Sequence, residues 1–196
     1  MKEKGTISKT IFEVVSVAVS AIVTIILIFT FGFRVVTVDG QSMVPTLDHQ
    51  DVLLAVTSKT SFDYGDIIIV VQPGQLNKSL IKRVIATEGQ WIDINYATGD
   101  VSVGETPDAM VTLDEPYIAE LTTQRPYSDK HVYPVQVPEG YVFAMGDNRN
   151  DSIDSRSEYV GFVDEQYILG KAVVRVKTQA NGIDPSAFDI YYNFGG

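Results

Sequence analysis

A long uncharged stretch near the N-terminus constrains the fold of this 196-residue chain more than any other feature. Residues 14–33 are apolar apart from scattered Ser, Thr and Gly, and they contain no charged side chain. A helix needs about 20 such residues to cross the hydrocarbon core of a bilayer, because it rises only about 1.5 Å per residue. Serine and threonine hydroxyls can bond to the preceding helical turn, so they are compatible with lipid. The stretch therefore predicts a transmembrane helix, which we place at residues 11–33.

The flanks of this stretch indicate an anchor rather than a cleaved secretory signal. A cleaved signal has a shorter apolar region that ends at a small-x-small site, whereas here Phe31, Phe33 and Arg34 stand at that place. Three lysines precede the span, and cytoplasmic flanks are enriched in lysine. We therefore expect a single-pass protein of the cell membrane, with residues 1–10 as a cytoplasmic tail and residues 34–196 outside the cytoplasm.

The residues after the anchor predict a mainly β domain. Short runs rich in Val, Ile and Tyr, bounded by Gly, Pro, Asp or Asn, have the pattern of strands. These runs lie at residues 36–38, 51–56, 66–71, 79–85, 91–94, 101–103, 141–145 and 171–176. Many short strands at this spacing favour an antiparallel barrel or sandwich. Residues 104–134, rich in proline, fit inserted loops or a subdomain, and only residues 164–169 look helical.

The composition narrows the chemistry that this chain can perform. The absence of cysteine excludes a disulfide scaffold, a thiolate nucleophile and a cysteine-ligated metal. His49 and His131 are the only histidines, which leaves little material for a histidine metal site, and neither has the context of a Ser-His-Asp triad. The formal net charge is −10, and an acidic body does not bind nucleic acid by counterion release. We expect no metal, no cofactor and no nucleic-acid partner.

One serine lies in a stiff turn just after the anchor. In the segment V-D-G-Q-S-M-V-P-T-L, residues 38–47, Gly40 relaxes the backbone before Ser42 and Pro45 fixes it afterwards. A hydroxyl held in this way suits a nucleophile. Taken alone, the segment is better explained as a plain loop leaving a membrane helix. Two segments further along the chain favour the nucleophile instead.

A lysine in an apolar strand can supply the base that a serine nucleophile needs. Lys82 lies in S-L-I-K-R-V-I-A, residues 79–86, where burial would disfavour its ammonium form and lower its pKa. The alternative is a lysine whose head group reaches water, the usual arrangement on a strand. Alternation points Lys82 and Arg83 to opposite faces, so one of them can be buried and the other solvated, and the sequence does not decide which.

The segment M-G-D-N-R-N-D-S-I-D-S-R, residues 145–156, can hold such a lysine in place. Its charged side chains can form a compact network that stiffens the loop, namely Asp147, Arg149, Asp154 and Arg156. Ser152 can form a hydrogen bond with the lysine nitrogen and orient it. A calcium loop is the alternative, since Glu158 is twelfth counting from Asp147, but an arginine at the third position and the missing glycine at the sixth argue against it.

In order and spacing, these segments resemble type I signal peptidases, with the single span and small size of the Gram-positive form. The likeness extends from the anchor to about Val176. It rests on S-M-x-P-T-L at 42–47, Gly65-Asp66 before an Ile/Val run, K-R-V-I at 82–85 with Gly89, and the segment G-D-N-R-N-D-S-I-D-S-R at 146–156. The resemblance implies a transmembrane helix followed by an antiparallel β catalytic domain of the signal-peptidase and repressor-autoprotease type.

The resemblance also implies a function and assigns residue roles. The protein would be a membrane-anchored serine endopeptidase that removes signal peptides from secreted pre-proteins through an acyl-enzyme. Ser42 would be the nucleophile, Lys82 the general base and Ser152 the group that orients the lysine. The residues that support the site structurally would be Asp147, Arg149, Asp154 and Arg156. The expected partners are the signal peptides and the membrane lipid.

We expect the substrate to lie extended between the strand before Ser42 and the strand that carries Lys82, since strand addition gives affinity with little sequence reading. The pockets for small side chains before the cut would be lined by Val38, Met43, Leu80 and Ile81. Gly40 stands where some family members carry a serine that helps to bind the oxyanion, so the Ser42 backbone N–H would be the main donor.

Another departure from the family pattern affects the turn after the lysine, where Ala86, Glu88 and Gln90 replace the frequent Gly, Pro and Asp. We expect a changed turn and unchanged chemistry. Two other functions use similar features. One is a membrane-tethered module that binds peptides without cutting them, and the other is a repressor-type Ser/Lys autoprotease, against which the membrane span argues.

Overall fold

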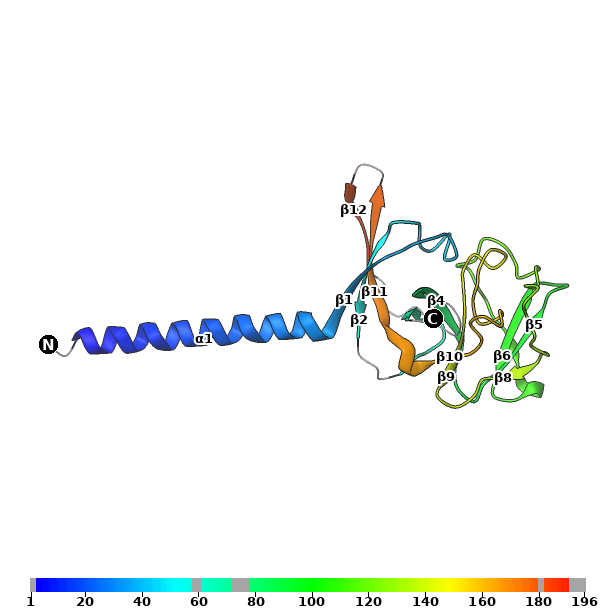
Figure 1. The fold of residues 1–196 in the computed structure, drawn as a ribbon, viewed down its shortest axis with the longest axis horizontal. Coiled ribbons are helices and arrows are strands. Elements are labelled where there is room, and N and C mark those ends of the chain that lie inside the picture. The colour runs from blue at the N-terminus through cyan, green and yellow to red at the C-terminus, as the bar shows by residue number, and fades with distance from the viewer. Residues whose placement is uncertain (1–2, 58–60, 72–77, 180–181, 191–196) are drawn as a thin grey trace.

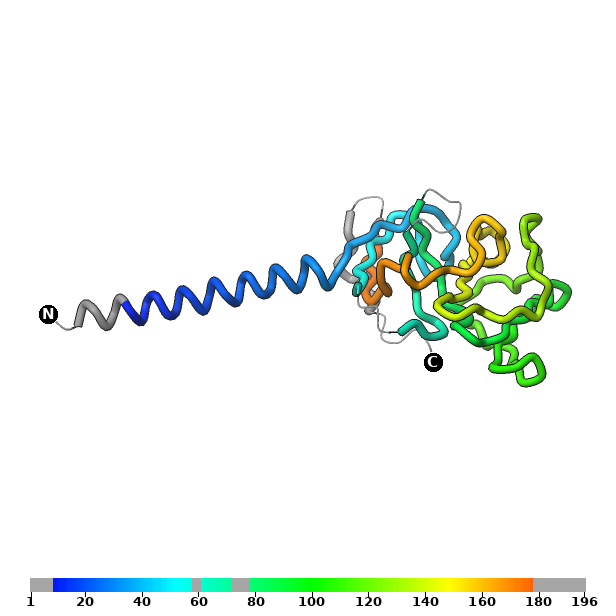
Figure 2. The backbone as a smooth tube through the Cα atoms, turned by 60° about the horizontal axis from the view of Figure 1, so that its bottom comes forward, coloured from blue at the N-terminus to red at the C-terminus, as the bar shows by residue number. Residues whose placement is uncertain are grey.

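The computed structural model of the protein describes residues 3–57, 61–71, 78–179 and 182–190. A long helix, α1 (Glu3–Gly32), extends away from a β-rich body (Figures 1 and 2). Its part Lys9–Gly32 is long and apolar enough to cross a membrane, and the protein buries none of it. The predicted N-terminal apolar helix is therefore confirmed, and the helix also includes most of the segment that we expected to be a polar tail.

Most strands after α1 form one antiparallel sheet of eight strands, the main sheet. Along the sheet the order is β1 (Phe33–Thr37), β2 (Val52–Val56), β11 (Ile168–Gln179), β3 (Ile67–Val70), β4 (Leu80–Ala86), β9 (Tyr141–Met145) and β10 (Val163–Asp164), and β12 (Gly182–Ile190) pairs with β11. Between β10 and β11 lies a 3₁₀ turn, Glu165–Tyr167, which is shorter than the helix expected at residues 164–169.

The edge strand β1 begins at the residue after α1, so helix and sheet are joined without a linker. Thr57, the residue that follows β2, reinforces this junction from the neighbouring strand. Its backbone N–H donates to the Gly32 carbonyl at 3.0 Å, and its hydroxyl donates to the Phe31 carbonyl at 2.6 Å. The end of the apolar helix is thus fixed to two adjacent strands of the main sheet.

A second antiparallel sheet, the small sheet, lies at the end of the body far from α1 (Figures 1 and 2). Its strand order is β7 (Val111–Thr112), β6 (Asp100–Gly104), β5 (Trp91–Asn95) and β8 (Val135–Gln136), with a 3₁₀ turn, Pro107–Ala109, before β7. Residues 104–134 therefore supply β7 and the connections of this sheet. The prediction of a mainly β, antiparallel fold is confirmed.

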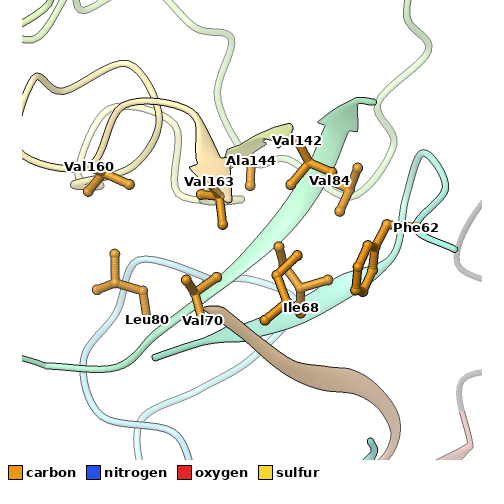
Figure 3. Close-up of a cluster of buried hydrophobic side chains, with 10 residues drawn as sticks. Phe62, Ile68, Val70, Leu80, Val84, Val142, Ala144, Val160 and Val163 are labelled. Atoms are coloured by element: carbon orange, nitrogen blue, oxygen red, sulfur yellow. The ribbon is translucent and has the colours of Figure 1, made fainter. Parts of the chain in front are cut away.

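Buried apolar side chains cover both faces of the main sheet. On β3, Ile68 and Val70 belong to the cluster drawn in Figure 3, whereas Ile67 and Ile69 belong to a second cluster on the opposite face. Two covered faces explain why this strand is apolar at every position instead of alternating. A third cluster joins β4 and β9 to the small sheet and includes Ile85, Ile92, Val101, Phe143 and Met145.

Candidate active site

Ser42 and Lys82 are in direct contact. Lys82 Nζ lies 2.6 Å from Ser42 Oγ and 2.9 Å from the carbonyl oxygen of Ile81, so it is within hydrogen-bond reach of both. The lysine projects from β4, and the serine lies in the turn that follows β1. The structure thus brings together the two residues that the sequence singled out as nucleophile and base.

The environment of Lys82 favours a neutral amine. The side chain is 2% exposed, and alternation along β4 places it on the same face as Leu80 and Val84 of the cluster in Figure 3. Burial lowers the pKa of Lys82 to about 8, while the carboxylates of Asp154 and Asp147 oppose the shift. An amine with this pKa is partly neutral near neutral pH and can accept a proton.

Arg83 is buried as well, at 3% exposure, so neither residue is solvated, although alternation would have allowed one of them to be. The guanidinium of Arg83 donates two hydrogen bonds to Asp147 and one to the carbonyl of Gly65. These acceptors replace water and compensate the charge, which allows an arginine to lie inside the protein. The alternation holds, but both faces of β4 are covered.

The turn that carries Ser42 is tied to the loop that follows β9. Gly40 has a φ of +107°, in the left-handed region that favours glycine. The backbone N–H of Asn148 donates to the Ser42 carbonyl at 3.0 Å, and the hydroxyl of Thr46 donates to Asp147. Within the described part of the chain the backbone N–H of Ser42 donates to no acceptor, so it can donate to a substrate oxygen.

Gly146 lies where the two loops come closest. A Cβ atom at this position would overlap the carbonyl oxygen of Ser42 and the side chain of Ser152. The site therefore has room for glycine only. The sequence marked Gly146 as part of a turn, but the close approach of a loop from another part of the chain could not be predicted from it.

Ser152 lies beside Gly146, and its buried hydroxyl forms no hydrogen bond within the described residues. The bond that we expected between this hydroxyl and Lys82 is not formed, since the lysine nitrogen donates to Ser42 and to the Ile81 carbonyl. The role of Ser152 in orienting the lysine stays a prediction.

Asp154 and Arg156 form a fully buried ion pair behind the site. The two side chains are joined by hydrogen bonds of 2.8 and 2.7 Å, and Asp154 also accepts the backbone N–H of Gly146. Burial acts to raise the pKa of Asp154, but Arg156 outweighs burial and holds this pKa below its usual range. The carboxylate therefore stays charged and fixes the start of the loop.

The other two of the four residues that we expected to form one network pair outside this segment. Asp147 pairs with Arg83, and Arg149 pairs with Glu115 from the connection that follows β7. The ring of Tyr117, two residues further on, has its centroid 3.9 Å from the Arg83 guanidinium carbon. Sequence reasoning missed Glu115 and Tyr117, because no local pattern links them to Arg149 and Arg83, which lie more than 30 positions away in the sequence.

A cleft of about 420 Å³ opens beside the Ser42–Lys82 contact. Its walls come from residues 36–43 and 78–82, with Asp151 and Ile153 at one side. All four predicted pocket residues line it, namely Val38, Met43, Leu80 and Ile81. The pairing of β4 with β9 begins only at Arg83, so the earlier residues of β4 have no partner strand on that side among the described residues.

Comparison with known proteins gives a consistent set of relatives. A family profile described as "Signal peptidase, peptidase S26" matches residues 11–177. A probable signal peptidase I-1 of Synechocystis sp. PCC 6803 is 37% identical over 150 residues, which cover 70% of this chain and 68% of that protein. Signal peptidase I of Bacillus licheniformis is 32% identical over 177 residues, covering 86% and 90% respectively. The crystal structure of a signal peptidase I from Enterococcus faecalis V583 matches 58% of this chain and 98% of that chain, at 28% identity and a TM-score of 0.44.

Proposed function

Because this chain belongs to the signal peptidase family, peptidase S26, and is a membrane-anchored serine peptidase that removes signal peptides from secreted pre-proteins, we propose that Ser42 and Lys82 perform the cleavage. The observation that supports these roles is the 2.6 Å contact between Ser42 Oγ and Lys82 Nζ, with the amine buried. A module that only bound peptides would have no use for a buried, partly neutral amine in contact with a serine.

The reaction follows from this contact. Neutral Lys82 takes the proton of Ser42, whose oxygen attacks the scissile carbonyl carbon and forms a tetrahedral intermediate. The backbone N–H of Ser42 stabilises the developing oxyanion. The lysine ammonium then protonates the departing amine, which leaves as the new N-terminus of the mature protein, and an acyl-enzyme remains. Water deprotonated by the same lysine hydrolyses the ester and restores the serine hydroxyl.

The cleft suggests how the substrate is held. The pre-protein lies extended between residues 38–41 and 79–82, where a backbone edge can accept an added strand without reading its sequence. Side chains of an extended peptide alternate in direction, so the first and third residues before the cut point to the same wall. The side chains that form the walls are those of Val38, Met43, Leu80 and Ile81. These apolar walls suit small apolar groups.

The rate of cleavage should follow the ionisation of Lys82. The neutral amine is the active form and the pKa is about 8, so kcat/KM should rise about tenfold per pH unit below this value and level off above it. The measurement is a pH profile of the full-length protein in detergent micelles with a pre-protein substrate, with the folded fraction checked at each pH. A profile that stayed flat from about pH 6 to about pH 10 would exclude Lys82 as the base.

We also propose the orientation of the protein in the cell membrane, with residues 1–10 in the cytoplasm, residues 11–33 across the bilayer and residues 34–196 outside. The lysines before the apolar span support this orientation. Membrane lipid would then surround the exposed apolar side chains of α1.

Because the chain has no cysteine, a single introduced cysteine can report this orientation. Tyr127 is fully exposed, and we expect a Tyr127→Cys protein to react in intact cells with a maleimide that cannot cross membranes. A Ser8→Cys protein should react only after lysis. The reverse pattern of labelling would contradict the proposed orientation.

A further inference from the structure

We propose that Glu115 and Tyr117 are positioning residues for the cleavage reaction. Both belong to the connection between β7 and β8, in the part of the chain that forms the small sheet. Neither lines the cleft beside the catalytic pair, so they act through other side chains. This inference rests on the proposed roles of Ser42 and Lys82.

Glu115 acts on the loop that packs against the nucleophile. Its two carboxylate oxygens accept hydrogen bonds of 2.6 and 2.5 Å from Arg149, and the two side chains are only 6% and 0% exposed. Arg149 also donates from Nε to the carbonyl of Gly146 at 3.2 Å. Gly146 fits tightly against Ser42. The carboxylate of Glu115 therefore holds the Arg149 side chain in position, and Arg149 in turn holds Gly146 against Ser42.

Tyr117 acts on the strand that carries the base. Its ring lies over the guanidinium of Arg83, the residue after Lys82, in a cation–π contact. Arg83 donates hydrogen bonds of 2.8 and 2.7 Å to Asp147, which also accepts the hydroxyl of Thr46. These contacts connect β4, which carries Lys82, to the turn that carries Ser42. The Tyr117 ring covers one face of the Arg83 guanidinium between them.

The two residues form one unit, which we call the Glu115–Tyr117 pair. The Tyr117 hydroxyl donates to Glu115 at 2.7 Å and lies 3.1 Å from the hydroxyl of Tyr64. Burial and the charge of Glu115 raise the pKa of Tyr117, so the phenol keeps its proton at neutral pH and remains a donor. The Glu115–Tyr117 pair therefore contacts residues that support both the turn that carries Ser42 and the strand that carries Lys82.

The test measures kcat and KM for purified full-length protein in detergent micelles with a pre-protein substrate. We expect Glu115→Gln and Tyr117→Leu each to lower kcat about tenfold or more and to leave KM within about twofold, because the dyad geometry changes and the cleft walls do not. Tyr117→Phe keeps the ring over Arg83 and should retain at least about a third of the parental kcat.

Two matched controls come from the same part of the chain. Asp114→Asn removes an exposed carboxylate one residue away, and Tyr127→Leu removes a fully exposed ring. Both should keep the parental kcat and KM. All assays run well below the unfolding midpoint of each variant. Glu115→Gln leaves Arg149 buried without its counterion and can unfold the protein, in which case Tyr117→Leu, which keeps that ion pair, decides the test.

A folded Tyr117→Leu protein with the parental kcat would overturn the inference, because the residue would then serve stability alone. A rise in KM at constant kcat would overturn it as well, since it would place the effect on substrate binding. Ser42→Ala serves as the inactive reference. If Ser42→Ala still cleaved the pre-protein, the proposed catalytic roles would fail, whatever the variants of the Glu115–Tyr117 pair did.

Discussion

Cleavage should almost cease when Lys82 is replaced by Met, with kcat falling about 10⁴-fold, the upper range for loss of a general base. Methionine has a similar length and fills the same buried space, but it cannot take the proton of Ser42. The measurement is the single-turnover rate of pre-protein cleavage at about pH 9, where the parent amine is mostly neutral. A Lys82→Met protein that kept more than about a hundredth of the parental rate would rule out the amine as the base.

The same substitution should not destabilise the fold. The pKa of Lys82 is about 8 in the folded protein and 10.5 in the unfolded chain, so below pH 8 the buried ammonium lowers the free energy of unfolding by about 3 kcal/mol. Between these two values the unfolded chain binds a proton that the folded protein has released, so stability rises with pH. Lys82→Met should therefore be at least as stable as the parent at pH 7. Lys130→Met, at an exposed position, is the matched control and should change neither rate nor stability.

The second large effect is expected for Gly146→Ala, which should lower kcat about 100-fold, since displacements near 1 Å at a catalytic site have effects of this size. The added methyl group would overlap the Ser42 carbonyl and the side chain of Ser152, so the loop must move away from the serine turn. Overpacking of this kind also lowers the free energy of unfolding, by about 1–3 kcal/mol.

Steady-state kinetics and a denaturant titration of the Gly146→Ala protein measure both quantities. Gly32→Ala is a suitable control, because a Cβ atom at Gly32 meets no atom within 4 Å. Retention of more than about half of the parental kcat by Gly146→Ala would show that the loops tolerate a wider separation.

The features that could be predicted from sequence are those that leave a local pattern. An uncharged apolar run predicts α1, and short β-branched runs predict most strands of the main sheet. Ser42 and Lys82 were found because each lies in a compact motif whose spacing resembles a known family. Their distance of 2.6 Å is a property of the fold, but the motifs were sufficient to name the pair.

The features that could not be predicted depend on contacts between distant segments. Arg83 is buried because Asp147, 64 positions away, accepts two of its hydrogen bonds. Arg149 takes its counterion from Glu115, in a proline-rich stretch with no strand pattern of its own. Alternation along β4 predicts that Lys82 and Arg83 point in opposite directions, but it cannot predict that other segments cover both faces of the strand.

The direct junction between α1 and β1 leaves only a short chain between the apolar helix and the nucleophile. The five residues of β1 span about 17 Å at about 3.3 Å per residue, and Ser42 follows five positions after Thr37. Hydrogen bonds from Thr57 to the last turn of α1 restrict rotation of the helix relative to β1. With the proposed orientation in the membrane, the catalytic pair would lie at a fixed distance from the lipid, and it would reach only those bonds that a precursor presents at that distance.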